Sequence, residues 1–360
     1  MSLTRADLAE TGASIEAVQL PSGMIPWFEG GHADPWNHVE AAMALSATGR
    51  VEAAERAYEW LCATQREDGA WHAYYTSAGE VEEPRLDTNV TAYIATGVRQ
   101  HHAATGDDGF LEEMWPALER AIDWALRWQA PSGALAWSVS PDGVPGGFAL
   151  LAASSSACMS LSSAIACAQA LGRERPHWEA ALRRLALAVA FFPGGFLPKD
   201  EFAMDWYYPV LSGALSGGAA ELRVDAGWRS WVVEGHGVRC RSDGEWVTAA
   251  ETAECALACI RLGRRQAASR LLHWVRELRG DGGSYATGTV RPEGAEFPLG
   301  ERTTYSAAAV VLAGDALAGS PAAAALLSPL ASSPPAGALA SGAGHAGTRA
   351  QEEGDVTAVA

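Results

Sequence analysis

Alanine-rich, helix-like runs alternate with plainer amphipathic runs along most of this 360-residue chain. The amphipathic runs place apolar residues three and four positions apart, which is the spacing of a helix that buries one face. Six of the alanine-rich runs begin with a cluster of polar and aromatic residues. The alternation predicts a series of helical hairpins, each made of one alanine-rich helix and one amphipathic helix.

Twelve helices are predicted, at residues 4–18, 35–48, 51–64, 88–104, 109–129, 156–171, 177–191, 205–215, 219–233, 249–262, 264–278 and 303–317. Their connections alternate between tight turns, such as Gly49-Arg50 and Gly263-Arg264, and long loops with Pro and Gly. Tight turns on one rim and long loops on the other predict an all-α fold, an (α/α)6 barrel whose N-terminal helix closes against the last helix. We expect the functional site at the long-loop rim, because loops on a rigid scaffold commonly carry function.

The domain prediction is a single barrel, residues 1–319, because no linker interrupts the hairpins. From 320 to 360 the sequence turns to Ala, Ser, Pro and Gly, so this tail is predicted to be disordered and dispensable. Residues 1–13 carry charges and no continuous apolar run, and no segment approaches the roughly 20 apolar residues of a spanning helix. These features predict a soluble, cytoplasmic protein without membrane insertion.

Charge and cysteine content narrow the possible partners. The formal net charge of −17 would repel phosphate backbones and anionic bilayers, so no nucleic acid partner is expected. The six cysteines show no CxxC spacing and most lie in apolar helical runs, which predicts free thiols.

The six polar clusters that open the alanine-rich helices carry the candidate chemistry. They read GGHADPWNH (30–38), PRLDTN (84–89), ASSSAC (153–158), FAMDWYY (202–208), EWVTAAETAE (245–254) and GERTTY (300–305). Because they begin the predicted inner helices, all six should meet at one end of the barrel. Helix N-termini also direct partial positive charge into that rim, which favours carboxylates and substrate hydroxyl or anionic groups there.

Two known families share parts of this pattern. Residues Gln65–Trp71 read QREDGAW and match the QxxxGxW repeat of squalene cyclases, with weaker echoes at 129–137 and 279–285. The segment Asp87–Gln129, with DTNVTAY and TGDDGFLEEMWPALERAIDWAL, resembles the six-hairpin, glucoamylase-like glycosidases. Both resemblances imply an α/α barrel, with Gln65 and Trp71 bracing a loop to a helix.

The chemistry of the rim favours the glycosidase. A terpenoid cyclase or prenyltransferase would need DxDD, DDxxD or a zinc-binding Asp, Cys and His set, and the chain has none of these at the required spacing. Hydrolysis of a glycosidic bond needs one carboxyl group that protonates the leaving oxygen and one carboxylate that activates water or attacks the anomeric carbon. The six openings supply carboxylates together with aromatic rings that can hold a sugar.

The predicted catalytic carboxylates are Asp87, Asp205 and Glu254. We assign Asp205 as the acid because its aromatic neighbours Trp206, Tyr207 and Tyr208 would raise its pKa. Glu254 is assigned as the base because its position, one turn inside a helix, is not explained by capping. The family resemblance implies inversion of configuration.

The predicted substrate-binding residues come from the same openings. They are Trp27, His32, Asp34, Trp36, His38, Asn89, Trp206, Tyr207, Glu251, Glu301, Arg302 and Tyr305. Helix capping is the alternative for Asp34, which precedes Pro35, for Asp87, and for Glu251, which follows Thr248 at capping-box spacing. Glu301 and Arg302 could form a substrate clamp or an ion pair.

A metal site at His32, Asp34 and His38 is a further alternative. Because no second ligand pair such as HExxH accompanies it, we expect neither a metal nor another cofactor. The expected partner is a small-molecule or oligosaccharide substrate. Two other functions stay open: a terpenoid cyclase or prenyltransferase-like enzyme, and a non-catalytic binder of a sugar or metabolite.

Overall fold

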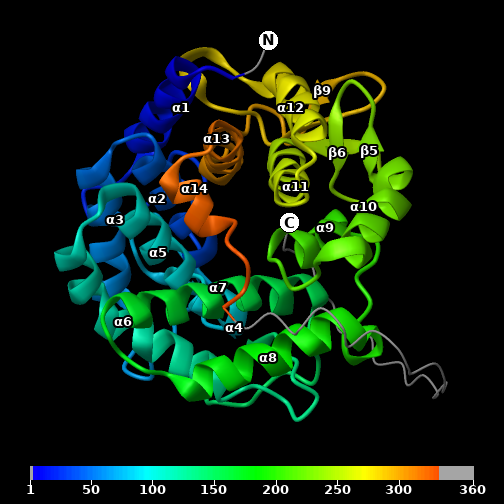
Figure 1. The fold of residues 1–360 in the computed structure, drawn as a ribbon. Coiled ribbons are helices and arrows are strands. Elements are labelled where there is room, and N and C mark those ends of the chain that lie inside the picture. Colours follow the sequence, from blue (N-terminus) through cyan, green and yellow to red (C-terminus); the bar gives the residue numbers. More distant parts are fainter. Residues whose placement is uncertain (1–2, 332–360) are drawn as a thin grey trace.

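The computed structural model describes residues 3–331 and shows a closed ring of inner helices surrounded by outer helices (Figure 1). The inner helices are α2 (Pro35–Ala47), α4 (Thr88–Ala92) continued by α5 (Ile94–Thr105), α7 (Leu151–Ala170), α9 (Ala203–Leu211), α11 (Ala249–Arg261) and α13 (Thr304–Ala318). Each contacts the next, and α13 returns to α2. The (α/α)6 barrel is therefore confirmed.

The outer helices cover this ring. They are α1 (Arg5–Val18), α3 (Val51–Thr64), α6 (Asp108–Leu126), α8 (Pro176–Phe191), α10 (Gly217–Trp231) and α12 (Arg265–Trp274). Outer helices bury one face, whereas α7 buries nearly all of its Ala, Ser and Cys side chains, whose small size lets neighbouring helices approach closely. As predicted, α1 packs against α13 and closes the ring.

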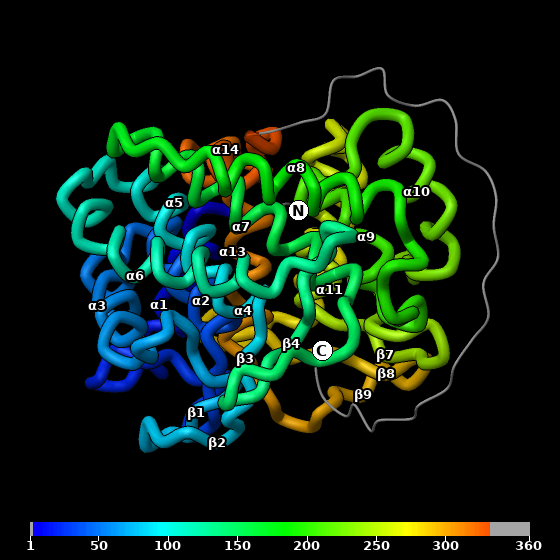
Figure 2. The backbone as a smooth tube through the Cα atoms, turned by 90° about the horizontal axis from the view of Figure 1, so that it is seen from below, coloured from blue at the N-terminus to red at the C-terminus, as the bar shows by residue number. Residues whose placement is uncertain are grey.

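The two rims differ in the way that the sequence predicts. Tight turns place glycine in the left-handed region, for example Gly49 at φ 77° and Gly263 at φ 74°. The opposite rim carries the long loops, which hold every strand of the described residues (Figure 2). These are β1 (Tyr74–Tyr75), β2 (Val81–Glu83), β3 (Leu86–Asp87), β4 (Ser138–Val139), β5 (Val232–Val233), β6 (Gly237–Arg239), β7 (Trp246–Thr248), β8 (Gly288–Val290) and β9 (Ala295–Glu296).

The strands were not predicted, because segments of two or three residues show no alternation in the sequence. Two of their pairings join loops that are distant along the chain: β3 pairs with β4, and β7 pairs with β8 within the antiparallel sheet of β5 to β9. This pairing gives the long-loop rim a fixed shape, although its connections are long.

The QxxxGxW segment is a brace between hairpins, as expected. The Gln65 side-chain amide donates to the carbonyl oxygens of Gly69, at 2.8 Å, and Ala117, at 2.9 Å, and the Trp71 indole donates to Leu61 O. Gln19 and Gln129 make equivalent pairs of bonds in their own hairpins. The repeat therefore stabilises the junctions between hairpins and takes no part in the site.

The predicted tail boundary was wrong for residues 320–331. They form α14 (Pro321–Leu326) and a following turn, which lie across the end of the ring opposite the strands (Figures 1 and 2). The half-buried Arg261 guanidinium donates to Leu326 O and Ser328 O, and the side chains of Leu326 and Leu330 are buried. The alanines of this segment bury enough surface because they pack against α5, α7 and α13. Residues 332–360, the rest of the predicted tail, lie outside the described residues.

Helix α7 is the one helix of residues 3–331 that is long and apolar enough to cross a bilayer by length and composition. Its most apolar window is 83% buried inside the ring. The burial of this window identifies α7 as a core helix of the barrel.

Replacing Gly69 with alanine should destabilise the barrel more than the same change at Gly49. Both glycines have positive φ, 103° and 77°, but a Cβ at Gly69 would lie 2.5 Å from Arg120 O, whereas a Cβ at Gly49 meets nothing within 4 Å. Gly49→Ala should cost about 1 kcal/mol of unfolding free energy, and Gly69→Ala about 3 kcal/mol because the backbone must also move. Urea denaturation measures both, and equal losses would contradict the close approach.

Removing α14 should destabilise the protein. A chain that ends at Gly319 loses the buried Leu326 and Leu330, each worth about 1.5–3 kcal/mol, and leaves the Arg261 guanidinium without two acceptors. A chain that ends at Ala331 is the control and should unfold at the same urea concentration as the full chain. Equal midpoints for the two shortened chains would show that α14 contributes nothing.

Candidate active site

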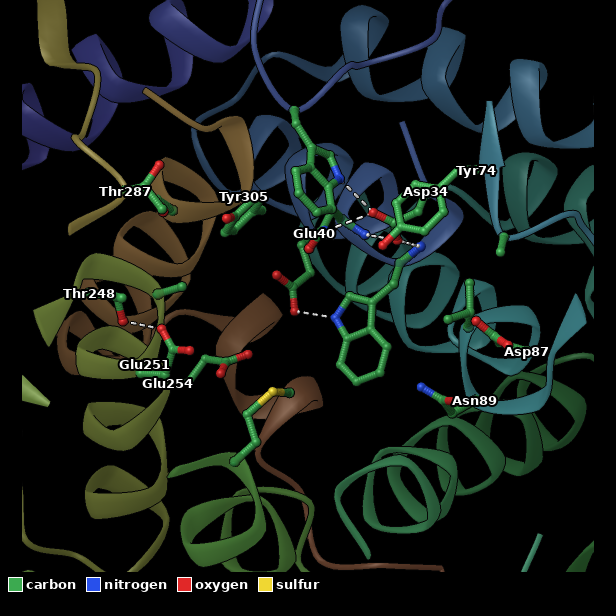
Figure 3. A pocket seen from close by; sticks show the side chains of 18 of the residues that line it. Asp34, Glu40, Tyr74, Asp87, Asn89, Thr248, Glu251, Glu254, Thr287 and Tyr305 are labelled. Carbon is green, nitrogen blue, oxygen red and sulfur yellow. Dashed lines mark hydrogen bonds between the residues drawn. The ribbon is translucent and has the colours of Figure 1, made fainter. Parts of the chain in front are cut away.

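The N-terminal ends of the inner helices surround a pocket of about 860 Å³ at the long-loop rim (Figure 3). We call it the central pocket. It is lined by Trp27, Asp34, Trp36, Asn37, Glu40, Ala73, Tyr74, Asp87, Asn89, Val90, Trp137, Met204, Trp246, Thr248, Ala250, Glu251, Glu254, Thr287, Tyr305 and Ser306. Carboxyl groups and aromatic rings thus meet in one cavity, as predicted for this rim.

Asp34 lies at the start of α2 and both caps that helix and faces the pocket. Its Oδ1 accepts the backbone N–H groups of Trp36 and Asn37, at 2.9 and 3.0 Å. Its Oδ2 accepts the Trp27 indole at 2.6 Å and the Asn37 amide at 2.7 Å. Burial raises the pKa of Asp34 even though these bonds oppose the shift. Capping and substrate binding were the two alternatives for this residue. The structure shows that Asp34 caps α2 and also lines the pocket.

Glu251 projects into the pocket from the first turn of α11, on the side opposite Asp34 (Figure 3). The Thr248 hydroxyl donates to its Oε2. Thr248 makes no side-chain bond to the helix backbone, so the expected capping box does not form and the hydroxyl orients the carboxylate instead.

Glu40 and Glu254 lie deeper, and aromatic donors hold both. Glu40 Oε1 accepts the Trp36 indole at 2.9 Å and the Tyr93 hydroxyl at 3.1 Å. Glu254 accepts the Tyr207 hydroxyl on one oxygen and the Tyr208 hydroxyl, at 3.3 Å, on the other.

Burial raises the pKa of both of these carboxyl groups, to about 7 for Glu40 and well above the ordinary range for Glu254. The charge of Glu40 adds to the shift at Glu254. A raised pKa favours the protonated form of Glu254, whereas a base must be ionised, so the shift argues against the base role that the sequence suggested. Glu40 was missed, although it gives the same signal as Glu254: a carboxylate within an alanine-rich inner helix.

The negative charge of Asp87 is balanced by the positive charge of Arg85. The Arg85 guanidinium forms a two-pronged pair with it, at 2.9 and 3.2 Å, and lies over the Trp137 ring. Burial raises the pKa of Asp87 while Arg85 opposes the shift. Its side chain makes no capping bond to α4, so its carboxylate is available to the pocket.

Asp205 lies in an adjoining cavity of about 750 Å³, which we call the side cavity. This cavity is lined by Trp36, Asn89, Trp137, Leu150, Ala152, Ala153, Lys199, Phe202, Met204, Asp205, Cys240 and Glu251. Burial raises the pKa of Asp205 to about 6, opposed by the N–H of Ala152, which donates to Oδ1 at 3.1 Å. Glu251 is the one carboxylate of the described residues that lines both cavities.

Several predicted substrate-binding residues lie outside both linings. His38 is buried between the N–H of Ile25 and the carbonyl of Ala57, and burial lowers its pKa to about 4. The Trp206 indole donates to Arg223 O, and the Tyr207 hydroxyl donates to Glu254.

The remaining three meet neighbours at the rim. Glu301 accepts the Thr287 hydroxyl at 2.9 Å, and Arg302 forms an ion pair with Glu296 at 2.7 Å, so Arg302 is in an ion pair, but its partner is not Glu301. His32 lies beside the pocket, 3.1 Å from Glu82 and edge-on to the Trp27 ring.

The alternative of a metal at His32, Asp34 and His38 does not fit this arrangement, because His38 is bonded to the backbone on both ring nitrogens. Within residues 3–331, no group of three His, Cys, Asp or Glu side chains is arranged to hold a metal ion. All six cysteines are free thiols, as predicted.

No protein-family model matches the chain. It is 45% identical over 315 residues, covering 88% of this chain and 87% of the relative, to the MMP endo-(1,4)-3-O-methyl-alpha-D-mannosidase of Mycolicibacterium hassiacum (strain DSM 44199 / CIP 105218 / JCM 12690 / 3849). The chain belongs to the family of this mannosidase. It is a glycoside hydrolase, and the prediction of a carbohydrate-active enzyme is confirmed, whereas the terpenoid and non-catalytic alternatives are set aside.

Solved structures agree on the fold of this glycoside hydrolase. A wild-type glycosidase superposes with a TM-score of 0.67 at 16% identity over 87% of this chain and 98% of its own. The GH63 mannosylglycerate hydrolase from Thermus thermophilus, in complex with glucose, has a TM-score of 0.67 at 12% identity over 85% and 99%. These likenesses confirm the predicted six-hairpin barrel.

The buried carboxyl of Glu40 should make the glycoside hydrolase less stable as pH rises. Its pKa is about 7 in the folded chain against an ordinary 4.5, so its favourable contribution is complete below about 4.5 and is lost as pH rises through about 7. Glu40→Gln should remove up to about 3 kcal/mol of this dependence, since a shift of one pKa unit corresponds to ~1.4 kcal/mol. Urea denaturation at about pH 5 and pH 8 measures this dependence, and the exposed Glu52→Gln is the control. If the unfolding free energy of Glu40→Gln changes with pH as much as that of the wild type, the prediction is wrong.

Proposed function

We propose that this enzyme hydrolyses α-1,4 linkages between mannose units, including 3-O-methylated ones. The support is its 45% identity to an enzyme with that name, together with a rim pocket in which carboxyl groups face aromatic rings. Trp27, Trp36 and Tyr305 supply apolar faces against which a pyranose ring can pack.

The position of Glu251 carries the mechanistic part of the proposal. A glycosidic bond joins two sugars, and if these occupy the central pocket and the side cavity, the bond lies where the two cavities meet. Glu251 lines both, and the Thr248 hydroxyl orients its carboxylate. We assign Glu251 as the base that takes a proton from the water attacking the anomeric carbon.

Asp34 is the proposed acid. It faces the central pocket from the side opposite Glu251, and burial raises its pKa, which favours the protonated form that the leaving oxygen needs. After proton transfer, the Trp27 indole and the amide of Asn37 stabilise the resulting carboxylate. Asp87, with its charge balanced by Arg85, is placed to accept bonds from substrate hydroxyl groups.

Asp205 stays a second candidate for the acid, as predicted from the sequence. Its pKa of about 6 suits a proton donor, and it shares the side cavity with Glu251. Inversion of configuration also stays a prediction, and the anomeric form of the first product, followed by proton NMR, tests it. We further propose a cytoplasmic location, since six unpaired cysteines suit a reducing compartment.

The carboxyl variants should separate these roles. Glu251→Gln should lower kcat/KM on α-1,4-mannose oligosaccharides by about 10³-fold or more while the melting temperature stays near that of the wild type. Asp34→Asn should show a similar loss on oligosaccharides, yet retain most of its activity on a dinitrophenyl glycoside, whose leaving group needs no proton.

Asp205→Asn is compared with Asp34→Asn to identify the acid, and Glu254→Gln is compared with Glu251→Gln to identify the base. If Asp205→Asn, and not Asp34→Asn, is rescued by the dinitrophenyl leaving group, the acid is Asp205. Full activity of both Asp34→Asn and Glu251→Gln on oligosaccharides would reject the proposed pair, and absence of turnover by the wild type on every mannoside would reject the substrate class.

A further inference from the structure

The side cavity differs from the central pocket in polarity. The apolar side chains of Leu150, Ala152, Ala153 and Phe202 line this cavity alone, while Trp36, Trp137 and Met204 line both cavities. Of its charged groups, Lys199 is paired with Glu201 at 3.8 Å, Asp205 accepts the N–H of Ala152, and Glu251 is shared with the central pocket. The central pocket, in contrast, contains five carboxyl groups, from Asp34, Glu40, Asp87, Glu251 and Glu254.

An unmodified sugar suits the central pocket better than the side cavity. Each hydroxyl group that leaves water needs a hydrogen-bond partner, and a hydroxyl against an apolar wall loses that partner. O-methylation removes the donor and adds an apolar group, so the same wall then becomes favourable. The two cavities therefore suit sugars that differ in methylation.

We propose that the side cavity is the subsite for an O-methylated sugar next to the bond that is cleaved, with the methyl group against Leu150, Ala153 and Met204. The inference rests on the proposed mannosidase activity and adds where, and why, the enzyme would prefer an O-methylated sugar to an unmethylated one. Glu251 lies at the junction of the two cavities, so a sugar in the side cavity would place its glycosidic oxygen beside the reacting carboxylate.

Ala153 offers the cleanest test of this subsite. It lies in the first turns of α7 and lines the side cavity but not the central pocket. A leucine there would fill space that the methyl group needs. A serine, which α7 already carries at the three following positions, would place a hydroxyl in the apolar wall with little change in volume.

The measurement is kcat/KM for two α-1,4-mannose oligosaccharides of equal length, one 3-O-methylated and one unmethylated. The wild type should prefer the methylated substrate by roughly 10- to 100-fold, the selectivity that one apolar group provides in a fitted pocket. Ala153→Leu should lower kcat/KM on the methylated substrate by about 10-fold more than on the unmethylated substrate, because the added side chain occupies the space of the methyl group. Ala153→Ser should also lower the ratio of kcat/KM on the methylated substrate to kcat/KM on the unmethylated one.

Ala170→Leu is the matched control, because Ala170 is exposed at the opposite end of the same helix, and it should leave both activities unchanged. Equal activity of the wild type on both substrates, or equal losses on both in Ala153→Leu and Ala153→Ser, would overturn the methyl subsite while leaving the mannosidase proposal intact. No cleavage of either substrate by the wild type would instead reject the activity on which the inference rests.

Discussion

The structure depends on the convergence of six inner-helix N-termini at one rim of a closed ring. The ring can close only if neighbouring inner helices approach closely, and the small side chains of α7 meet that requirement. Consequently, several polar residues at the helix openings, among them Asp34, Asp87 and Glu251, face one another in the central pocket, where the helix N-termini favour negative charge.

Burial of so many carboxyl groups is costly, and the aromatic residues offset part of that cost. The indole and phenol donors of Trp27, Trp36 and Tyr93 hold Asp34 and Glu40, and Tyr207 and Tyr208 hold Glu254. Without these donors Glu40 and Glu254 would lose the hydrogen bonds that satisfy them, whereas Asp34 would keep those from Trp36 and Asn37. Of the rings that were expected to bind sugar, Trp27 and Trp36 therefore both line the pocket and hold carboxyl groups, whereas Tyr207 holds Glu254 without lining the pocket.

The two ends of the barrel have different tasks. Paired strands shape the rim of the long loops, whereas α14 closes the opposite end, where Leu326 lines a small cavity with Glu40 and Glu254. The deepest carboxyl groups of the central pocket, Glu40 and Glu254, are only 5% and 8% exposed, so most water is excluded from them. That exclusion is the reason why burial dominates their pKa shifts.

The helices, their order and the rim that carries the chemistry were predictable, because hydrophobic periodicity and glycine turns are local properties of the chain. Val51–Thr64 was predicted with its observed limits. Glu254 was singled out correctly as a pocket carboxyl, since capping did not explain it. The same reasoning applied to Glu40 would have found that residue as well.

Other features are set by contacts between distant segments. β3 pairs with β4, and β7 with β8, across different loops. Arg261 and three helices hold α14, whose alanine-rich sequence by itself resembles a tail. Likewise His38 and Asp205 stand in openings as promising as those of Asp34 and Glu251, yet one is bonded to the backbone and the other faces a second cavity. The sequence by itself determined which helices form and that their polar openings meet; only the tertiary structure decided which side chains share a cavity, because that depends on how each helix is rotated against its neighbours.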